Sequence, residues 1–156
     1  MKSQSGQLTV GEICGREVVY TYANMSIGEA ARLMREEHVG SLVVVSDKEK
    51  KKLVVGMLTD RDIALAVVAT GHASEMLVVA EIMSKNLVTT RAEDSMHAAL
   101  GLMRHHGVRR LPVTDADGVL IGIVALDDLL DILAEELQGL VQVIAREKQR
   151  ELQVRT

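Results

Sequence analysis

The sequence predicts an α+β fold, with local α/β character, made of two copies of one βαββα unit. Three observations support this prediction: an internal repeat, the same order of strand and helix signals in both copies, and a hydrophobic content of 47%. That content is ordinary for a folded globular domain. The core is expected to consist of Val, Leu, Ile, Ala and Met, because the chain has no Phe and no Trp.

The repeat appears when the chain is displaced by 69 residues, which places Val10 on Val79 and the Leu-Met-Arg triplet at 33–35 on the same triplet at 102–104. After a charged turn the displacement becomes 66, and Asp62 then falls on Asp128. Self-similarity over this length indicates two copies of one structural unit. We divide the chain into an N-terminal tail 1–9, unit 1 at 10–75, unit 2 at 76–137 and a C-terminal helix extension 138–156.

The first copy begins with a β-rich run, followed by a helix that starts at Ser26. Ser26 and Glu29 form an S-x-x-E capping box. Apolar residues then recur with the spacing of one helix face at Ile27, Ala30, Ala31 and Met34. The predicted elements of this copy are a strand at 18–20, a helix from 26, strands at 42–45 and 53–58, and a helix at 60–69.

The second copy repeats this order, with a hairpin signal at Asp117-Gly118 between its last two strands. Its predicted elements are a strand at 87–90, a helix from 95, strands at 111–114 and 119–124, and a helix from 127. In each copy a helix joins the first two strands, which predicts a parallel pair with a right-handed crossover. A three-stranded sheet with helices on one face stays half uncovered, so we expect the two units to stack.

The last helix is predicted to be long, because the chain runs without Pro from Leu126 to about Leu152. Its apolar residues alternate near three and four, as in a coiled-coil seam, at Leu126, Leu130, Leu133, Leu137, Leu140 and Ile144. Two interpretations remain open up to Gly139: a helix that caps the module's own core, or a dimer contact or signalling helix. Beyond Gly139 the charged run 146–153 predicts a projecting or frayed end.

Composition excludes several classes of function. The aromatic content is 1% and the net charge is −4, which argues against nucleic-acid binding by base stacking or phosphate contacts. Cys14 is the only cysteine, so neither a disulfide nor a cysteine zinc site is expected. The sequence has no membrane-spanning apolar stretch and no signal-peptide pattern, and we expect a cytoplasmic protein. No nucleophile–base pair, metal set or phosphate loop is visible, so we expect no enzyme activity and no metal.

One segment combines a strand end with a possible binding group. In GMLTDRD, residues 56–62, Thr59 and Asp62 have the spacing of a helix cap, and capping alone explains both residues. A carboxylate held at a helix start also stays ionised and accepts hydrogen bonds from the 2′- and 3′-hydroxyls of a ribose. In the second copy, Arg109 and Arg110 stand just before Pro112 and form either a phosphate clamp or a solvated strand end.

These segments resemble the two halves of a CBS-domain pair, also called a Bateman module. The resemblance rests on HVGSLVVV…GMLTDRDI and GVRRLPVTDADGVLIGIVALDDLL and covers Val10 to Leu137. It implies that the units pack through their sheets with pseudo-twofold symmetry and leave two clefts. It also implies a regulatory ligand, an adenosine nucleotide such as AMP, ADP or ATP, without an obligatory cofactor.

The resemblance also assigns residues to the two clefts. In one cleft, Thr59 and Asp62 would hold the ribose, Gly40 and Ser41 would line the floor, and Arg109 would approach a phosphate. The base would be held by Lys85, Asn86, Leu87, Val88 and Met57. In the other, Asp128 would act with Arg109, Arg110, Arg16 and Val18, and we add Pro112 to the candidate set. Ala125 stands where the family usually has Thr or Ser, which weakens the second cleft by one hydrogen bond, roughly 0.5–1.5 kcal/mol.

Three functions are compared at this point. The first is a nucleotide sensor that signals to a partner, the second a structural dimerisation module with vestigial clefts, and the third a small enzyme. We favour the first. We expect a homodimer, because the apolar helix faces and the Leu126–Ile144 seam exceed what two small sheets can bury. We also expect an unidentified protein target on another chain, since no further domain accompanies the module in this sequence.

Overall fold

The structure is a computed structural model that describes residues 7–155. Its elements in the first repeat are α1 (Val10–Ile13), β1 (Tyr20–Tyr22), α2 (Ile27–Glu36), β2 (Ser41–Lys48), β3 (Lys51–Thr59), α3 (Asp60–Ile63) and the π-helical turn η1 (Ala64–Val68). Those of the second repeat are α4 (Val79–Ile82), β4 (Thr90–Arg91), α5 (Met96–His106), β5 (Arg110–Thr114), β6 (Leu120–Ala125) and α6 (Leu126–Val154). The predicted βαββα order is confirmed in both copies, each with a short additional helix at its start.

Each repeat forms a three-stranded sheet, in the orders β1-β2-β3 and β4-β5-β6. The first pair in each sheet is parallel and the second antiparallel, as predicted. The first strands begin later than the predicted 18–20 and 87–90. The chain before β1 runs along β6 of the second repeat, where Gly15 bridges Ile123. The chain before β4 runs along β3 of the first repeat, where Ser84 bridges Met57. The two segments therefore join their own sheets only at Tyr20 and Thr90.

The capping signals act locally as the sequence predicts. Ser26 Oγ accepts from the backbone N–H of Glu29 at 3.1 Å, and Glu29 Oε2 accepts from the N–H of Ser26 at 3.2 Å. The box orients α2 so that Ile27, Ala30 and Met34 are buried against its sheet.

Two helical cores lie on the outer faces of the sheets, and each contains a short helix from the other repeat. Val10 of α1 is buried in the core of the second repeat, and Val79 of α4 is buried in the core of the first. Backbone bonds hold this exchange, from Val10 N to Asp94 O at 2.8 Å and from Val79 N to Met25 O at 2.9 Å. Each half of the module is therefore completed by the other.

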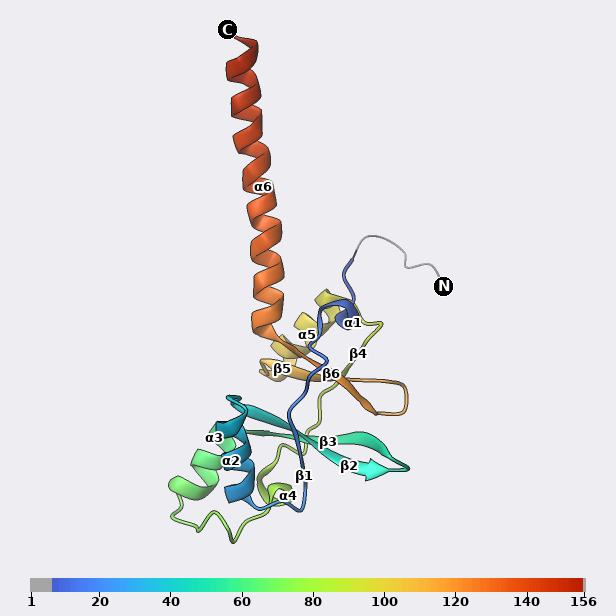
Figure 1. The fold of residues 1–156 in the computed structure, drawn as a ribbon, viewed down its shortest axis with the longest axis vertical. Coiled ribbons are helices and arrows are strands. Elements are labelled where there is room, and N and C mark those ends of the chain that lie inside the picture. Colours follow the sequence, from blue (N-terminus) through green and yellow to red (C-terminus); the bar gives the residue numbers. More distant parts are fainter. Residues whose placement is uncertain (1–6, 156) are drawn as a thin grey trace.

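A third apolar cluster joins the inner faces of the two sheets. Val43, Val45 and Val54 of the first sheet are buried there and pack with Leu120 and Ile123 of the second. The two sheets stack face to face, as Figure 1 shows. The predicted packing of two units through their sheets is confirmed.

The last helix leaves the body of the protein (Figure 1). Only its first two turns pack on the core, with Leu129 buried and Leu126 and Ile132 in contact with the same cluster. The interpretation that this helix caps the module's own core is wrong beyond these turns, because residues 133–155 are exposed. None of the helices within residues 7–155 is long and apolar enough to cross a membrane.

Candidate functional site

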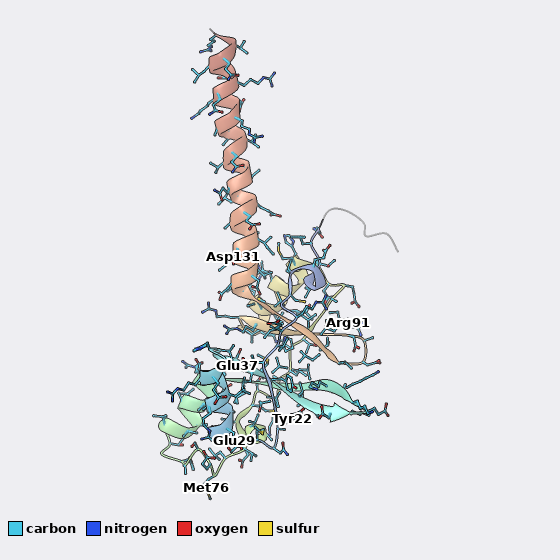
Figure 2. The ribbon with its side chains drawn as sticks, viewed as in Figure 1. Tyr22, Glu29, Glu37, Met76, Arg91 and Asp131 are labelled. Atoms are coloured by element: carbon cyan, nitrogen blue, oxygen red, sulfur yellow. The ribbon has the colours of Figure 1, made fainter. Side chains whose placement is uncertain are left out.

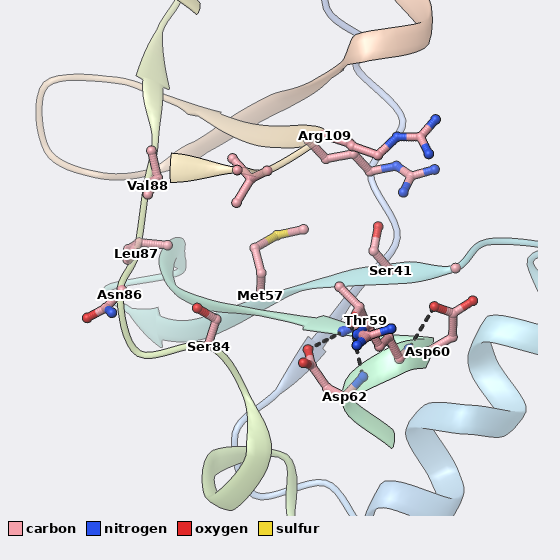
Figure 3. A pocket seen from close by; sticks show the side chains of 15 residues that line it. Ser41, Met57, Thr59, Asp60, Asp62, Ser84, Asn86, Leu87, Val88 and Arg109 are labelled. Atoms are coloured by element: carbon pink, nitrogen blue, oxygen red, sulfur yellow. Dashed lines mark hydrogen bonds between the residues drawn. The ribbon is translucent and has the colours of Figure 1, made fainter. Parts of the chain in front are cut away.

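A cleft of about 620 Å³ opens between the two repeats at the ends of their central strands. Figure 3 shows Thr59, Asp60 and Asp62 on one wall and Arg109 on the wall that faces them. Its lining residues come from both repeats, so neither unit alone contains the site. They are Gly40, Ser41, Met57, Thr59, Asp60, Arg61, Asp62, Ser84, Asn86, Leu87, Val88, Gly107, Val108, Arg109 and Arg110.

Asp62 is positioned by a reciprocal cap at the start of α3. Asp62 Oδ2 accepts from the backbone N–H of Thr59 at 2.9 Å, and Thr59 Oγ1 accepts from the N–H of Asp62 at 3.1 Å. Within the described chain, Asp62 Oδ1 accepts no hydrogen bond from another residue. The capping interpretation is therefore confirmed, and it leaves one carboxylate oxygen available at the cleft wall.

The cleft floor joins this cap to the central strand. Gly40 and Ser41 stand at the start of β2, and the carbonyl of Gly40 accepts from the backbone N–H of Asp60 at 2.9 Å. A Cβ atom at Gly40 would lie 3.1 Å from Asp60 Oδ2, so the glycine lets α3 approach the strand closely. Ser41 is buried, at 8% exposure, and adds a hydroxyl to the lining of the cleft.

The facing wall is cationic. Arg109 and Arg110 are both exposed and project from the start of β5. Arg61 adds a third guanidinium to the cleft from α3, the helix that carries Asp62. Arg109 Nη2 lies 3.4 Å from Asp127 Oδ1 in an ion pair whose side chains are 72% and 65% exposed. An exposed pair of this kind contributes little to stability, so its arginine can exchange partners readily.

The third side of the cleft is largely apolar. Leu87 and Val88 line the cleft from the segment before β4, and Met57 extends into it from β3 (Figure 3). A backbone bond from Ser84 N to Met57 O, 2.8 Å long, holds that segment on the strand. Asn86 adds an exposed amide at the same edge.

Ten of the predicted site residues line this cleft, and five do not. Lys85 is exposed beside the lining segment, and Pro112 is buried in β5 opposite Ile123 in the strand register. The other three belong to the set predicted for the second cleft: Arg16, Val18 and Asp128.

Those three residues have other contacts in the structure. Arg16 Nη2 donates to the carbonyl of Gly11 at 3.0 Å, and Val18 packs in the cluster between the sheets. Asp128 Oδ2 accepts from the backbone N–H of Ala125 at 2.9 Å, which is half of the cap seen at Asp62. The missing half is the hydroxyl that Ala125 lacks, as predicted.

Sequence reasoning missed five lining residues: Asp60, Arg61, Ser84, Gly107 and Val108. Asp60 and Arg61 lie inside the GMLTDRD motif, so the motif already contained the signal for them. Gly107 and Val108 likewise begin the GVRRLPVT segment, just before the two predicted arginines. Only Ser84 stands in a connecting segment without a distinguishing pattern, and the packing of the two repeats brings it to the cleft. Among the described residues, no group of three or more His, Cys, Asp or Glu is placed to hold a metal.

Comparison with known proteins identifies the class of this module. A family model described as CBS domain matches residues 10–69 and 79–135. The chain therefore belongs to the CBS-domain family and contains two tandem copies of the domain. Modules of this family are typically regulatory.

Individual relatives agree with this assignment. The chain is 42% identical over 113 residues to the CBS domain-containing protein YhcV of Bacillus subtilis, covering 72% of this chain and 76% of that protein. It is 34% identical over 125 residues to an uncharacterized protein of Methanopyrus kandleri, covering 80% of this chain but only 62% of that protein.

Solved structures share the architecture. A putative signal-transduction protein with CBS domains from Burkholderia ambifaria has a TM-score of 0.71 at 31% identity, covering 80% of this chain and 93% of that one. A CBS domain pair in complex with 5′-methylthioadenosine and S-adenosyl-L-methionine has a TM-score of 0.73 at 24% identity, covering 84% and 99% of the two chains. The second likeness shows the fold alone.

Proposed function

We propose that this module is a regulatory sensor that binds an adenosine-containing nucleotide in the cleft between its repeats. The observation that carries the proposal is the placement of a capped carboxylate, Asp62, across one cleft from the guanidinium groups of Arg109 and Arg110. Such a cleft is matched to a ligand that has hydroxyl donors at one end and anionic oxygens at the other. A ribose phosphate has both.

The ribose end of the ligand fits the Asp62 wall. Its cap orients the Asp62 carboxylate at the cleft wall. Oδ1 then accepts one ribose hydroxyl, and the second lone pair of Oδ2 remains for the other. Hydrogen bonds to a charged acceptor are about twice as strong as neutral ones, which makes this carboxylate the main anchor of the sugar.

The base fits the apolar side of the cleft. Met57, Leu87 and Val88 offer aliphatic surface for the two faces of an adenine ring, and the strand and linker backbones offer groups for its edge. The site lacks an aromatic platform, because neither tyrosine of the chain lines it. Stacking therefore contributes less than in aromatic sites, and we expect the modest affinity that suits a sensor of nucleotide concentration.

The phosphates fit the arginine wall. Arg110 has no ion-pair partner within residues 7–155, whereas Arg109 would exchange Asp127 for a phosphate oxygen. Guanidinium groups match phosphate oxygens in a bidentate geometry. Because Asp127 belongs to α6, this exchange also offers a route from ligand binding to the projecting helix, and from there to an unidentified protein target.

The ligand class is supported by the related domain pair that was solved with 5′-methylthioadenosine and S-adenosyl-L-methionine. Among adenosine ligands we favour AMP, ADP or ATP for this chain, because three arginines line its cleft. The second cleft, around Asp128, is proposed as a weaker site of the same kind. The working unit is proposed to be a homodimer.

Isothermal titration calorimetry of AMP, ADP, ATP and S-adenosylmethionine tests the proposal. At ligand concentrations 100-fold above Kd, bound nucleotide should stabilise the fold by about 2.7 kcal/mol. Arg110→Ala should weaken ATP binding more than AMP binding. Arg104→Ala, which removes an exposed arginine of α5 outside the cleft, is the matched control. Absence of binding by all four ligands at millimolar concentration would overturn the proposal in favour of a structural dimerisation module.

A further inference from the structure

The helix α6 is far longer than its own module requires. It spans 29 residues, Leu126–Val154, and its contacts with the core end at Ile132. In Figure 2 its side chains spread into solvent on all sides beyond Asp131. A free helix of this kind is only marginally stable in water, since most helical stability in proteins comes from packing of an apolar face. The exposed part of α6 therefore lacks a packing partner within residues 7–155.

An apolar seam runs along this exposed part. Its members recur with alternating spacings of three and four, which correspond to the a and d positions of a coiled coil. Their exposed fractions are 53% for Leu130, 39% for Leu133, 63% for Leu137, 66% for Leu140 and 56% for Ile144. Val141 and Val143 widen the seam at its far end. A continuous apolar stripe on a projecting helix indicates a protein surface that is covered in the assembled state.

The charges along α6 are divided between its two halves. Residues 126–140 contain five acidic and no basic side chains, whereas residues 141–155 contain four basic and two acidic ones. Within the described chain, no charged side chain of residues 131–155 forms an ion pair. The helix thus has an acidic half and a basic half of similar length, and both are unneutralised along the projecting part.

We infer that the occupant of this seam is α6 of a second copy of this chain, packed antiparallel. In this register Leu133 faces Ile144 of the second copy and Leu137 faces its Leu140, so that the last four seam residues of each helix stack in layers. The acidic half of each helix then lies against the basic half of the other. On one flank Asp131 approaches Lys148 of the second copy.

The other flank has the same complementarity, since Glu136 falls on the same side of the seam as Arg146. A parallel pair would bring the two acidic halves together and the two basic halves together, so like charges would repel along the whole contact. Exposed ion pairs contribute little energy each, and their main effect is to select the orientation of the partner. The antiparallel arrangement also puts the two module bodies at opposite ends of the helix pair, so they do not compete for space.

Disulfide trapping tests the orientation directly in the full chain. Cys14 is first replaced by Ser, and Leu133→Cys and Ile144→Cys are then introduced into separate chains. An antiparallel pair gives a disulfide-linked dimer when the two variants are mixed and little when either is oxidised alone. Self-linking of either single variant, as strongly as in the mixture, indicates a parallel pair and overturns the inference.

Measurement of the oligomeric state by light scattering is the second test. We expect a dimer for the wild type at micromolar concentration, at least tenfold weaker association for Leu137→Glu, and unchanged association for Gln138→Glu. Gln138→Glu is the control because it introduces the same charge one residue away from the seam position Leu137. A monomeric wild type, a tetramer, or a Leu137→Glu protein that associates like the wild type would each overturn the inference.

Discussion

Replacement of Asp62 by Ala separates the two roles of this side chain. In the folded protein its carboxylate caps α3 through a 2.9 Å bond from the N–H of Thr59. In the proposed complex the same carboxylate holds the ribose. The capping role predicts a loss of about 1 kcal/mol in the free energy of unfolding. The binding role predicts, in addition, a loss of nucleotide affinity that the removal of a helix cap by itself would not cause.

The size of that loss follows from the count of available acceptor sites. Oδ2 also accepts the capping N–H of Thr59, so as a lower limit we count only the hydrogen bond that Oδ1 makes to a ribose hydroxyl. A hydrogen bond to a charged group contributes about 1.5–3 kcal/mol. At 1.4 kcal/mol for each factor of ten, the affinity should fall by about 10- to 150-fold. Calorimetry with ADP, after circular dichroism has shown that the variant is folded, measures this change.

Glu29→Ala is the matched control. Glu29, labelled on α2 in Figure 2, caps its helix with the same reciprocal pattern, at 3.2 and 3.1 Å. It is not among the residues that line the cleft. It should lower stability by a similar amount and leave the ADP affinity unchanged. An Asp62→Ala protein that binds ADP within twofold of the wild type would refute the reasoning, and so would an equal loss of affinity in Glu29→Ala.

Three further predictions concern stability. Ala125→Thr should raise the Tm by roughly 2–4 °C, because its hydroxyl completes the cap with Asp128, and the backbone of Ala125 (φ −110°, ψ 153°) is already that of a capping residue. Gly122→Ala should lower the free energy of unfolding in urea by about 1–3 kcal/mol, because a Cβ atom there would lie 2.6 Å from the carbonyl oxygen of Gly15. Glu12→Gln should make stability less sensitive to acid. The backbone N–H and hydroxyl of Thr9 lower the pKa of Glu12 in the folded state, so its stabilising effect is present at neutral pH and is lost as the pH falls through that lowered pKa.

Each of these has an outcome that would contradict it. An unchanged Tm in Ala125→Thr would show that Asp128 alone satisfies the start of α6. Gly139→Ala, at an open helical position, serves as the control for Gly122 and should not destabilise the fold. If Gly122→Ala and Gly139→Ala change the free energy of unfolding equally, the close approach of the Gly15 backbone does not explain the need for glycine at position 122. If the free energy of unfolding falls in parallel for wild type and Glu12→Gln between pH 7 and pH 3, the Glu12 carboxylate does not contribute to stability through its bonds to Thr9.

Most of the local structure could be predicted from the sequence because its signals are local. The capping box at Ser26, the hairpin at Asp117-Gly118 and the long final helix all depend on residues within one or two turns of each other. The strands predicted at 18–20 and 87–90 begin two and three residues later in the structure. Val18 packs between the two sheets, and Leu87 and Val88 line the cleft, so their β-rich composition serves tertiary contacts that no local signal reveals.

The exchange of α1 and α4 between the repeats has no signature in periodicity or spacing. The helices α1 (VGEI) and α4 (VAEI) have nearly the same sequence, so the sequence pattern does not indicate which core each of them completes. The lack of a sequence pattern also accounts for the missed site residue Ser84, which gains a role only when two segments far apart in sequence face one cleft. The displacement of 66 also places Gly56 on Gly122. The reason for a glycine at these two positions is tertiary, because the backbone of Ser84 crosses close to Gly56 and the backbone of Gly15 crosses close to Gly122.

The sequence by itself determined that this protein consists of two copies of one unit, that Asp62 and Asp128 begin equivalent helices, and that α6 has an apolar seam. These are statements about order and periodicity, which a chain carries in one dimension. Only the tertiary structure decided that Asp62 faces the arginines of the other repeat, that Arg109 pairs with Asp127, and that the seam is left uncovered. Those facts depend on which surfaces remain after the two sheets have packed, and packing is set by contacts between residues far apart in the chain.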